Sequence, residues 1–82
     1  MKVINKVLIK VYDSDISENG KFIVPNNVAM IGGFAFYGRK SLKEVIIPEG
    51  VTEIGDSAFW RCVSLEEVVI PNSVTEIGNY AF

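Results

Sequence analysis

Three prolines divide most of this sequence into equal intervals, because Pro25, Pro48 and Pro71 lie 23 residues apart. The residues around each proline recur at the same spacing, and the segments align without a gap. Self-similarity at a fixed period of about 20 to 50 residues is typical of repeat architectures. A unit this short cannot bury a core of its own, so each copy must pack against its neighbours. The spacing therefore predicts a solenoid of similar coils stacked one on another.

The repeated columns are mostly small or apolar. The complete copies are residues 25–47 and 48–70, and residues 71–82 form a partial copy. We therefore expect residues 25–82 to form the repeat region. Besides the prolines, the columns identical in all three copies are Val28/Val51/Val74, Ile31/Ile54/Ile77, Gly32/Gly55/Gly78, Ala35/Ala58/Ala81 and Phe36/Phe59/Phe82.

Each unit combines extended segments with tight turns. Leu42, Val45 and Ile47 follow an L-x-x-V-x-I order rich in β-branched residues, which predicts a short parallel strand with these side chains inside. Successive strands would stack about 4.8 Å apart. Residues 51–54 and 74–77 predict a second short extended segment. The glycine that follows allows the chain to turn, and D-S-A-F-W-R-C predicts a single helical turn.

The repeat resembles the BspA-like class of leucine-rich repeats, whose unit reads approximately L-x-x-I-x-I-P-x-S-V-T-x-I-G-x-x-A-F-x-x-C-x-S. The resemblance covers residues 22–82, and the first copy departs from it because Arg39 occupies the column of Cys62. It implies a leucine-rich repeat in a right-handed coil, with a short parallel β-sheet on one face and short β or helical turns on the other. It also implies an interaction scaffold rather than an enzyme, at the cell surface or secreted.

Residues 1–20 do not follow the repeat, whereas Lys21–Val24 correspond to Glu44–Ile47. Together, residues 1–24 predict an N-terminal β-hairpin cap. The alternation over Val7–Val11 indicates a strand, and the polar segment 13–20 would close a hairpin onto Lys21–Val24. The N-terminus lacks the apolar stretch and cleavage site of a secretory signal. Because the sequence stops at Phe82, midway through a unit, we expect further repeats or another molecule to cover that edge.

The composition excludes several kinds of chemistry. The 82 residues include no histidine and one cysteine, which excludes a disulfide framework, an ordinary zinc site and a histidine-based triad within one chain. A net charge of -2 gives no reason to expect nucleic acid as a partner. The longest stretch without charged or strongly polar residues, Val28 to Tyr37, is too short to span a bilayer. We expect no nucleic-acid partner, no membrane insertion, no metal and no cofactor.

Alternation along the predicted strands places a second set of side chains on the outer side of the main sheet. Stacked apolar side chains flanked by charge are typical of a protein contact, although the same residues also stabilise a sheet by cross-strand packing. Tyr37 and Trp60 share a corner column, where aromatic residues contact partners or pack partly against the next coil. The candidate partner-binding residues on the sheet are Lys21, Ile23, Lys43, Glu44, Ile46, Glu66, Glu67 and Val69.

Three functions stay open from the sequence, and we favour the first. It is a non-enzymatic module that presents the exposed sheet face to a protein partner. The second is a structural spacer or a self-associating fragment whose uncovered C-terminal edge drives oligomerisation. The third is glycan chemistry by Glu44 and Glu67, which share a column as a retaining glycosidase pair would, although a small coil offers no deep pocket.

Two further features have simpler explanations than catalysis or metal binding. Cys62 has no histidine to activate it, and its family column implies a buried, small apolar residue. Asp13, Asp15 and Ser17 follow the D-x-D-x-S start of a calcium loop. The motif then fails, because Glu18 stands where the loop needs glycine and Val24 where it needs glutamate.

Overall fold

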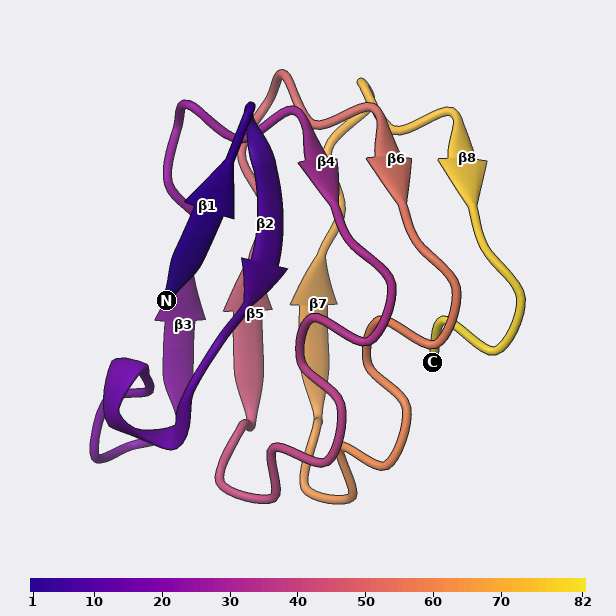
Figure 1. Cartoon of the computed structure of the whole chain (residues 1–82). Helices are drawn as coiled ribbons and strands as arrows, with labels where there is room; N and C mark the ends of the chain where they lie inside the picture. The colour runs from indigo at the N-terminus through magenta and orange to yellow at the C-terminus, as the bar shows by residue number, and fades with distance from the viewer.

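The fold consists of two β-sheets, one behind the other in Figure 1, with the core between them. The computed structural model describes all residues, 1–82. A five-stranded sheet contains, in spatial order, β1 (Lys2–Ile4), β2 (Val7–Lys10), β4 (Met30–Ile31), β6 (Glu53–Ile54) and β8 (Glu76–Ile77). A three-stranded sheet contains β3 (Lys21–Ile23), β5 (Glu44–Ile46) and β7 (Glu67–Val69).

The parallel pairs join residues 23 positions apart, as the sequence period predicts. In the three-stranded sheet, Lys21 pairs with Glu44 and Glu44 pairs with Glu67. In the five-stranded sheet, β4, β6 and β8 pair at the same spacing. The chain crosses from one sheet to the other and back in each unit, so it forms a solenoid of about three turns. The predicted stack of similar coils is confirmed.

The identical columns of the sequence form interior rows. The rings of Phe36 and Phe59 stack with their centroids 4.6 Å apart, and those of Phe59 and Phe82 stack at 5.2 Å. Leu42 and Val45, predicted to face inward, are fully buried. Because removing apolar surface from water is the main driving force of folding, these rows hold the coils together.

The segment predicted as a single helical turn is instead a series of tight turns. Within it, Cys62 N–H donates to the Phe59 carbonyl, three residues earlier, at 3.2 Å. Ser57 and Arg61 have φ angles of 54° and 62°. A residue in the left-handed region cannot continue a right-handed helix, so these two residues divide the segment into separate turns. The one helix of the chain is the single 3₁₀ turn η1 (Asp13–Asp15).

An N-terminal hairpin is present, but the predicted pairing of its strands is wrong. β1 pairs antiparallel with β2, whereas β2 and β3 lie in different sheets. β2 also pairs in parallel with β4, joining Val7 to Met30 and Leu8 to Ile31, again 23 positions apart. The solenoid therefore begins at β2, in a segment whose residues do not follow the repeat. A parallel ladder needs only an extended backbone and an inward apolar side chain, and Leu8, which is fully buried, supplies that side chain.

Candidate interaction surface

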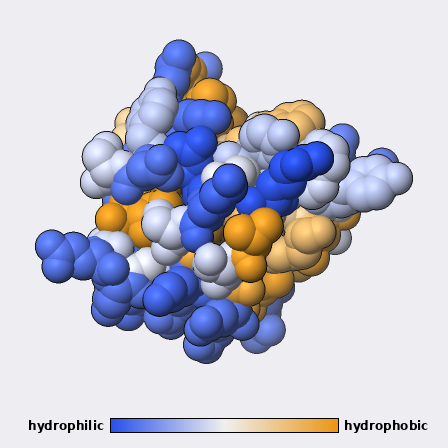
Figure 2. Space-filling view, turned by 90° about the horizontal axis from the view of Figure 1, so that it is seen from below, coloured by the Kyte–Doolittle hydropathy of each residue, from blue (hydrophilic) through white to orange (hydrophobic).

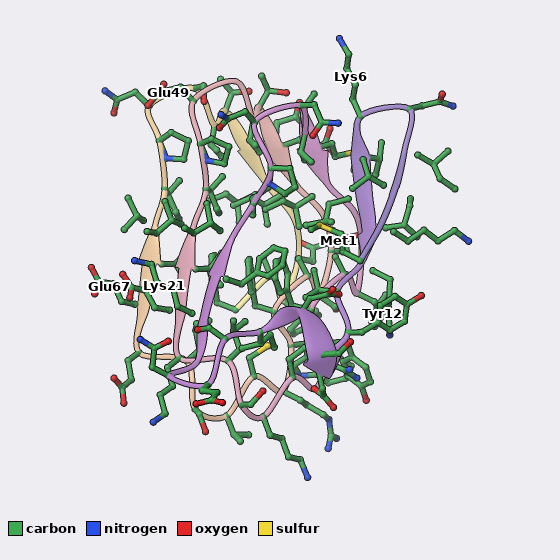
Figure 3. All side chains as sticks on the ribbon, turned by 90° about the vertical axis from the view of Figure 1, so that its left-hand side faces the viewer. Met1, Lys6, Tyr12, Lys21, Glu49 and Glu67 are labelled. Atoms are coloured by element: carbon green, nitrogen blue, oxygen red, sulfur yellow. The ribbon has the colours of Figure 1, made fainter.

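The outward side of the three-stranded sheet carries most of the predicted partner-binding residues, and we call it the outer face. Successive side chains of a strand point to opposite sides, so the buried Phe22 leaves Lys21 and Ile23 pointing outward. Figure 3 shows Lys21 and Glu67 projecting from the same side of the molecule, away from the interior. The outer face is defined by the columns Lys21/Glu44/Glu67 and Ile23/Ile46/Val69, with Lys43 and Glu66 beside them.

The apolar column of the outer face is open to solvent at both ends. The exposed fraction is 60% for Ile23 and 44% for Val69. Ile46, in the strand between them, is half-buried by its neighbours. Three branched side chains in one row therefore form an apolar stripe that crosses all three strands.

Backbone hydrogen bonds hold the charged residues of the outer face in register. The N–H groups of Lys43 and Glu44 both donate to the Gly20 carbonyl, at 2.7 and 3.0 Å. One coil later, the N–H groups of Glu66 and Glu67 both donate to the Lys43 carbonyl, at 2.8 and 3.1 Å. The repeated pattern gives the charged side chains equivalent positions in successive coils.

The charges of the outer face form no salt bridge within the chain. The two salt bridges of the molecule join the Met1 amine to Asp15 at 2.7 Å and Arg39 to Asp13 at 3.4 Å. The charged positions of the outer face change in sign from strand to strand. They are Lys21 at β3, Lys43 and Glu44 at β5, and Glu66 and Glu67 at β7. The apolar stripe is therefore accompanied by charge that changes from positive to negative along the stack.

Tyr37 and Trp60 lie on turns and not on the outer face. Their ring centroids are 5.7 Å apart, and both residues are exposed, at 36% and 41%. The structure adds two neighbours that sequence analysis missed: Phe34 meets Tyr37 edge to face, and the Arg61 guanidinium lies 5.4 Å from the Trp60 ring centroid. The shared column predicted the Tyr37–Trp60 contact, whereas the contact with Phe34 depends on the turn geometry. In Figure 2, from below, apolar patches interrupt a largely hydrophilic surface.

The carboxylates considered for glycan chemistry are neighbours on an open surface. Glu44 pairs with Glu67 across the β5–β7 ladder, as predicted. Their side chains belong to the outer face, and no hollow of the molecular surface is lined by both. The geometry therefore gives no support to an acid and nucleophile pair at this position.

Cys62 is half-buried and packs against the core, as its column implies. Its thiol donates a hydrogen bond to the Phe36 carbonyl at 3.0 Å. Burial raises the pKa of the Cys62 thiol, so the thiolate needed for nucleophilic chemistry is disfavoured. These contacts fit a packing role.

The two aspartates of the calcium-like segment, Asp13 and Asp15, both form ion pairs. Asp15 binds the Met1 amine and also accepts a hydrogen bond from Tyr12 N–H at 2.9 Å. The amine, followed by the Tyr12 hydrogen bond, lowers the pKa of Asp15. The chain contains no group of three His, Cys, Asp or Glu side chains that could hold a metal ion.

Comparisons with known proteins agree with this architecture. Residues 12–82 match the family model of the BspA type leucine rich repeat region (6 copies). The crystal structure of the T. pallidum leucine rich repeat protein (TpLRR) is similar to this chain, with a TM-score of 0.70 and 30% sequence identity. The similarity covers 74% of this chain and 31% of that chain, so this chain spans about a third of the length of that protein. No curated protein matches the sequence.

The stacked coils, parallel sheets and interior rows define a leucine-rich repeat solenoid. The chain belongs to the BspA-type leucine-rich repeat family, and the match begins ten residues earlier than the resemblance read from the sequence. Repeats of this kind are typically non-enzymatic interaction modules, and proteins of the family are typically found at the cell surface. None of the helical structure in this chain has the length and apolarity to cross a membrane.

Proposed function

We propose that this protein is a non-enzymatic module that binds a protein partner through its outer face. The apolar stripe of Ile23, Ile46 and Val69 carries the proposal, because its two ends stay exposed while Phe22 and Val45, on the inward side of the same sheet, are buried. A solvent-exposed apolar stripe rimmed by charge is typical of a protein contact. Membership of a family of interaction repeats supports the same class of function.

The lack of salt bridges on the outer face also supports a partner. Long charged side chains that are already paired would have to exchange one partner for another on binding. The carboxylates of Glu44, Glu66 and Glu67 and the ammonium of Lys21 are free to pair with charges on an incoming protein. Such complementarity chiefly raises specificity and the rate of association.

Peptide selection tests the proposal. A displayed random peptide library is selected on the wild-type chain, and each selected peptide is then titrated against variants by biolayer interferometry. Ile46→Ser and Val69→Ser should each weaken binding by about tenfold or more, since they remove the centre and one end of the apolar stripe. Val63→Ser is the matched control, because Val63 is 74% exposed on a turn.

A further variant distinguishes binding through the outer face from binding through the turns that carry Tyr37 and Trp60. Trp60→Ala reports on Trp60 and Tyr37, which are predicted contacts on a different surface. Circular dichroism of every variant checks that the fold persists. Peptides that bind the two outer-face variants as well as they bind wild type would overturn the proposal, and so would peptides that respond to Val63→Ser alone.

A second candidate function is self-association through the edge formed by residues 71–82. Ile77 and Phe82 are 52% and 55% exposed, whereas Ile54 and Phe59, their counterparts one coil earlier, are buried. Apolar rows exposed in this way favour contact with another apolar surface. Sedimentation across the micromolar range tests this candidate, and a monodisperse monomer throughout would contradict it.

A further inference from the structure

We propose that the partner segment on the outer face is an amphipathic α-helix that runs along the stack of coils, with its N-terminus over β7 and its C-terminus over β3. This inference rests on the proposed function and specifies the chemistry of the partner. Its support comes from three properties of the outer face: the spacing of the apolar stripe, the direction of the charge gradient and the absence of internal salt bridges.

The spacing of the apolar stripe favours a helix over an extended peptide. Neighbouring strands lie about 4.8 Å apart, so Ile23, Ile46 and Val69 span about 9.6 Å across three strands. Side chains at positions i, i+3 and i+7 of a helix lie at about 0, 4.5 and 10.5 Å along its axis. Alternate side chains of an extended peptide lie at about 0, 6.8 and 13.6 Å. The helix stays within about 1 Å of each strand position, whereas the extended peptide is about 4 Å out of step at the third strand.

The charge gradient sets the direction of the helix. The β3 row is positive through Lys21, and the β7 row is negative through Glu66 and Glu67. A helix has a partial positive charge at its N-terminus and a partial negative charge at its C-terminus. The N-terminus is therefore attracted to β7 and the C-terminus to β3. Basic side chains in the first turns of the partner and acidic ones in the last turns would strengthen the same orientation.

The contact requires only a short helix. Three rows correspond to about two helical turns, since each turn rises about 5.4 Å. An isolated helix of that length is marginal in water, so a partner segment would be part of a folded protein or would become helical on binding. The charged side chains beside the apolar stripe form no internal salt bridge, so none has to be released before the helix binds.

Designed peptides test the helical occupant. The test peptide has about 16 residues on an alanine-rich background, which favours a helix when the peptide is bound. It has leucines at i, i+3 and i+7, lysines in its first half and glutamates in its second half. One control has the same composition with the leucines alternating, and a second has the lysine and glutamate halves exchanged. Binding is followed by fluorescence anisotropy and by amide chemical shifts of the outer face.

The test peptide should bind about tenfold more tightly than either control. Equal or tighter binding of the alternating-leucine control would overturn the helical occupant. Equal or tighter binding of the exchanged-charge control would overturn the proposed direction.

Charge-reversed protein variants provide an independent test. The double variant Glu66→Lys/Glu67→Lys should bind the test peptide about tenfold more weakly and the exchanged-charge peptide more tightly. Glu53→Lys/Glu76→Lys is the matched control, because it makes the same change in net charge on the other sheet. An equal loss in the control variant would attribute the attraction to net charge and overturn the inference.

The two proposals fail in different ways. If no designed peptide binds but library-selected peptides still depend on Ile46 and Val69, the helical occupant is wrong and the outer face remains the binding site. If neither the designed nor the selected peptides depend on these residues, the proposed function itself is wrong.

Discussion

Two glycines show how single residues limit this fold in different ways. Gly55 has no positive φ, but a Cβ placed there would lie 2.6 Å from Gly33 N and 2.9 Å from the Gly32 carbonyl carbon. Gly38 has a φ of +69°, and a Cβ there would meet nothing within 4 Å. The first glycine is needed because two coils approach closely, and the second because of its own backbone conformation.

Alanine substitutions should separate these two requirements. Gly55→Ala forces the coils apart where Gly55 N–H donates to the Ile31 carbonyl at 2.7 Å, and should lower the free energy of unfolding by about 3 kcal/mol. Gly38→Ala introduces only a left-handed alanine and should cost about 1 kcal/mol. Urea denaturation measures both values. Equal losses in the two variants would show that close approach is not the limiting factor at Gly55.

Asp15 is expected to make stability depend on pH. The Met1 amine and Tyr12 N–H lower its pKa in the folded state. Its contribution is therefore complete above the unfolded pKa of about 3.9 and is lost as the pH falls through the lower, folded pKa. Asp15→Asn should lose less than about 1 kcal/mol at pH 7, because the pair is partly exposed to solvent.

The difference in unfolding free energy between wild type and Asp15→Asn should narrow as the pH is lowered from 5 to 2. Urea denaturation over this range provides the measurement. A difference that is constant with pH would exclude the ionised carboxylate as its source. Asp13→Asn is a useful comparison, since the carboxylate of Asp13 is 75% exposed and pairs with Arg39 at the longer distance of 3.4 Å.

At the scale of the element, stacking between coils matters more than the stability of any one strand. The repeat strands contain only two or three residues each. Strands this short are not stable alone, so they depend on the ladders above and below and on the interior rows. The hairpin of β1 and β2, with left-handed residues at its Asn5–Lys6 turn, covers one edge of the five-stranded sheet.

Phe59 should contribute more to stability than an exposed residue of the same coil. Its ring stacks on Phe36 on one side and on Phe82 on the other. Phe59→Ala should therefore cost about 3 to 5 kcal/mol. Val63→Ala, on an exposed turn, should change the free energy of unfolding by less than about 0.5 kcal/mol. Thermal and urea denaturation measure the two changes, and a small effect of Phe59→Ala would argue against the stacked row as the core.

At the scale of the whole molecule, stability should vary along the stack. The coil that contains β5 and β6 has neighbours on both sides, because β3 and β7 flank β5, and β4 and β8 flank β6. In a solenoid, the stability of each unit depends mainly on its contacts with the next units. The central coil should therefore open less often than the segments at either end.

Native-state hydrogen exchange tests this gradient. The Gly55 amide lies in the central coil and donates to the Ile31 carbonyl of the preceding coil. It should exchange about 100-fold more slowly than the Tyr12 amide, which donates to the side chain of Asp15. The measurement is made on the folded 82-residue chain by two-dimensional NMR. Equal protection of the two amides would indicate that the chain opens only as a single cooperative unit.

The 23-residue period determined the solenoid, its register and most of its interior rows. Identical residues at a constant spacing need equivalent environments, and only stacked coils supply them. The same alternation that buried Val45 correctly placed Ile46 and Glu44 on the outer side of the sheet. This part of the candidate site was predictable because strand geometry has a period of two residues.

Tertiary contacts decided the rest. Nothing local to Val7–Lys10 indicates whether it pairs with β3 or with β4, and only the folded chain places this strand between β1 and β4. Left-handed residues such as Ser57 replaced the predicted helical turn because the chain must reverse within a few residues between coils. The amino-acid sequence alone determined the period and the inward side of each strand. Only the folded chain decided where the N-terminal strands pair and which charges stay free on the outer face, because both depend on contacts between residues far apart in the sequence.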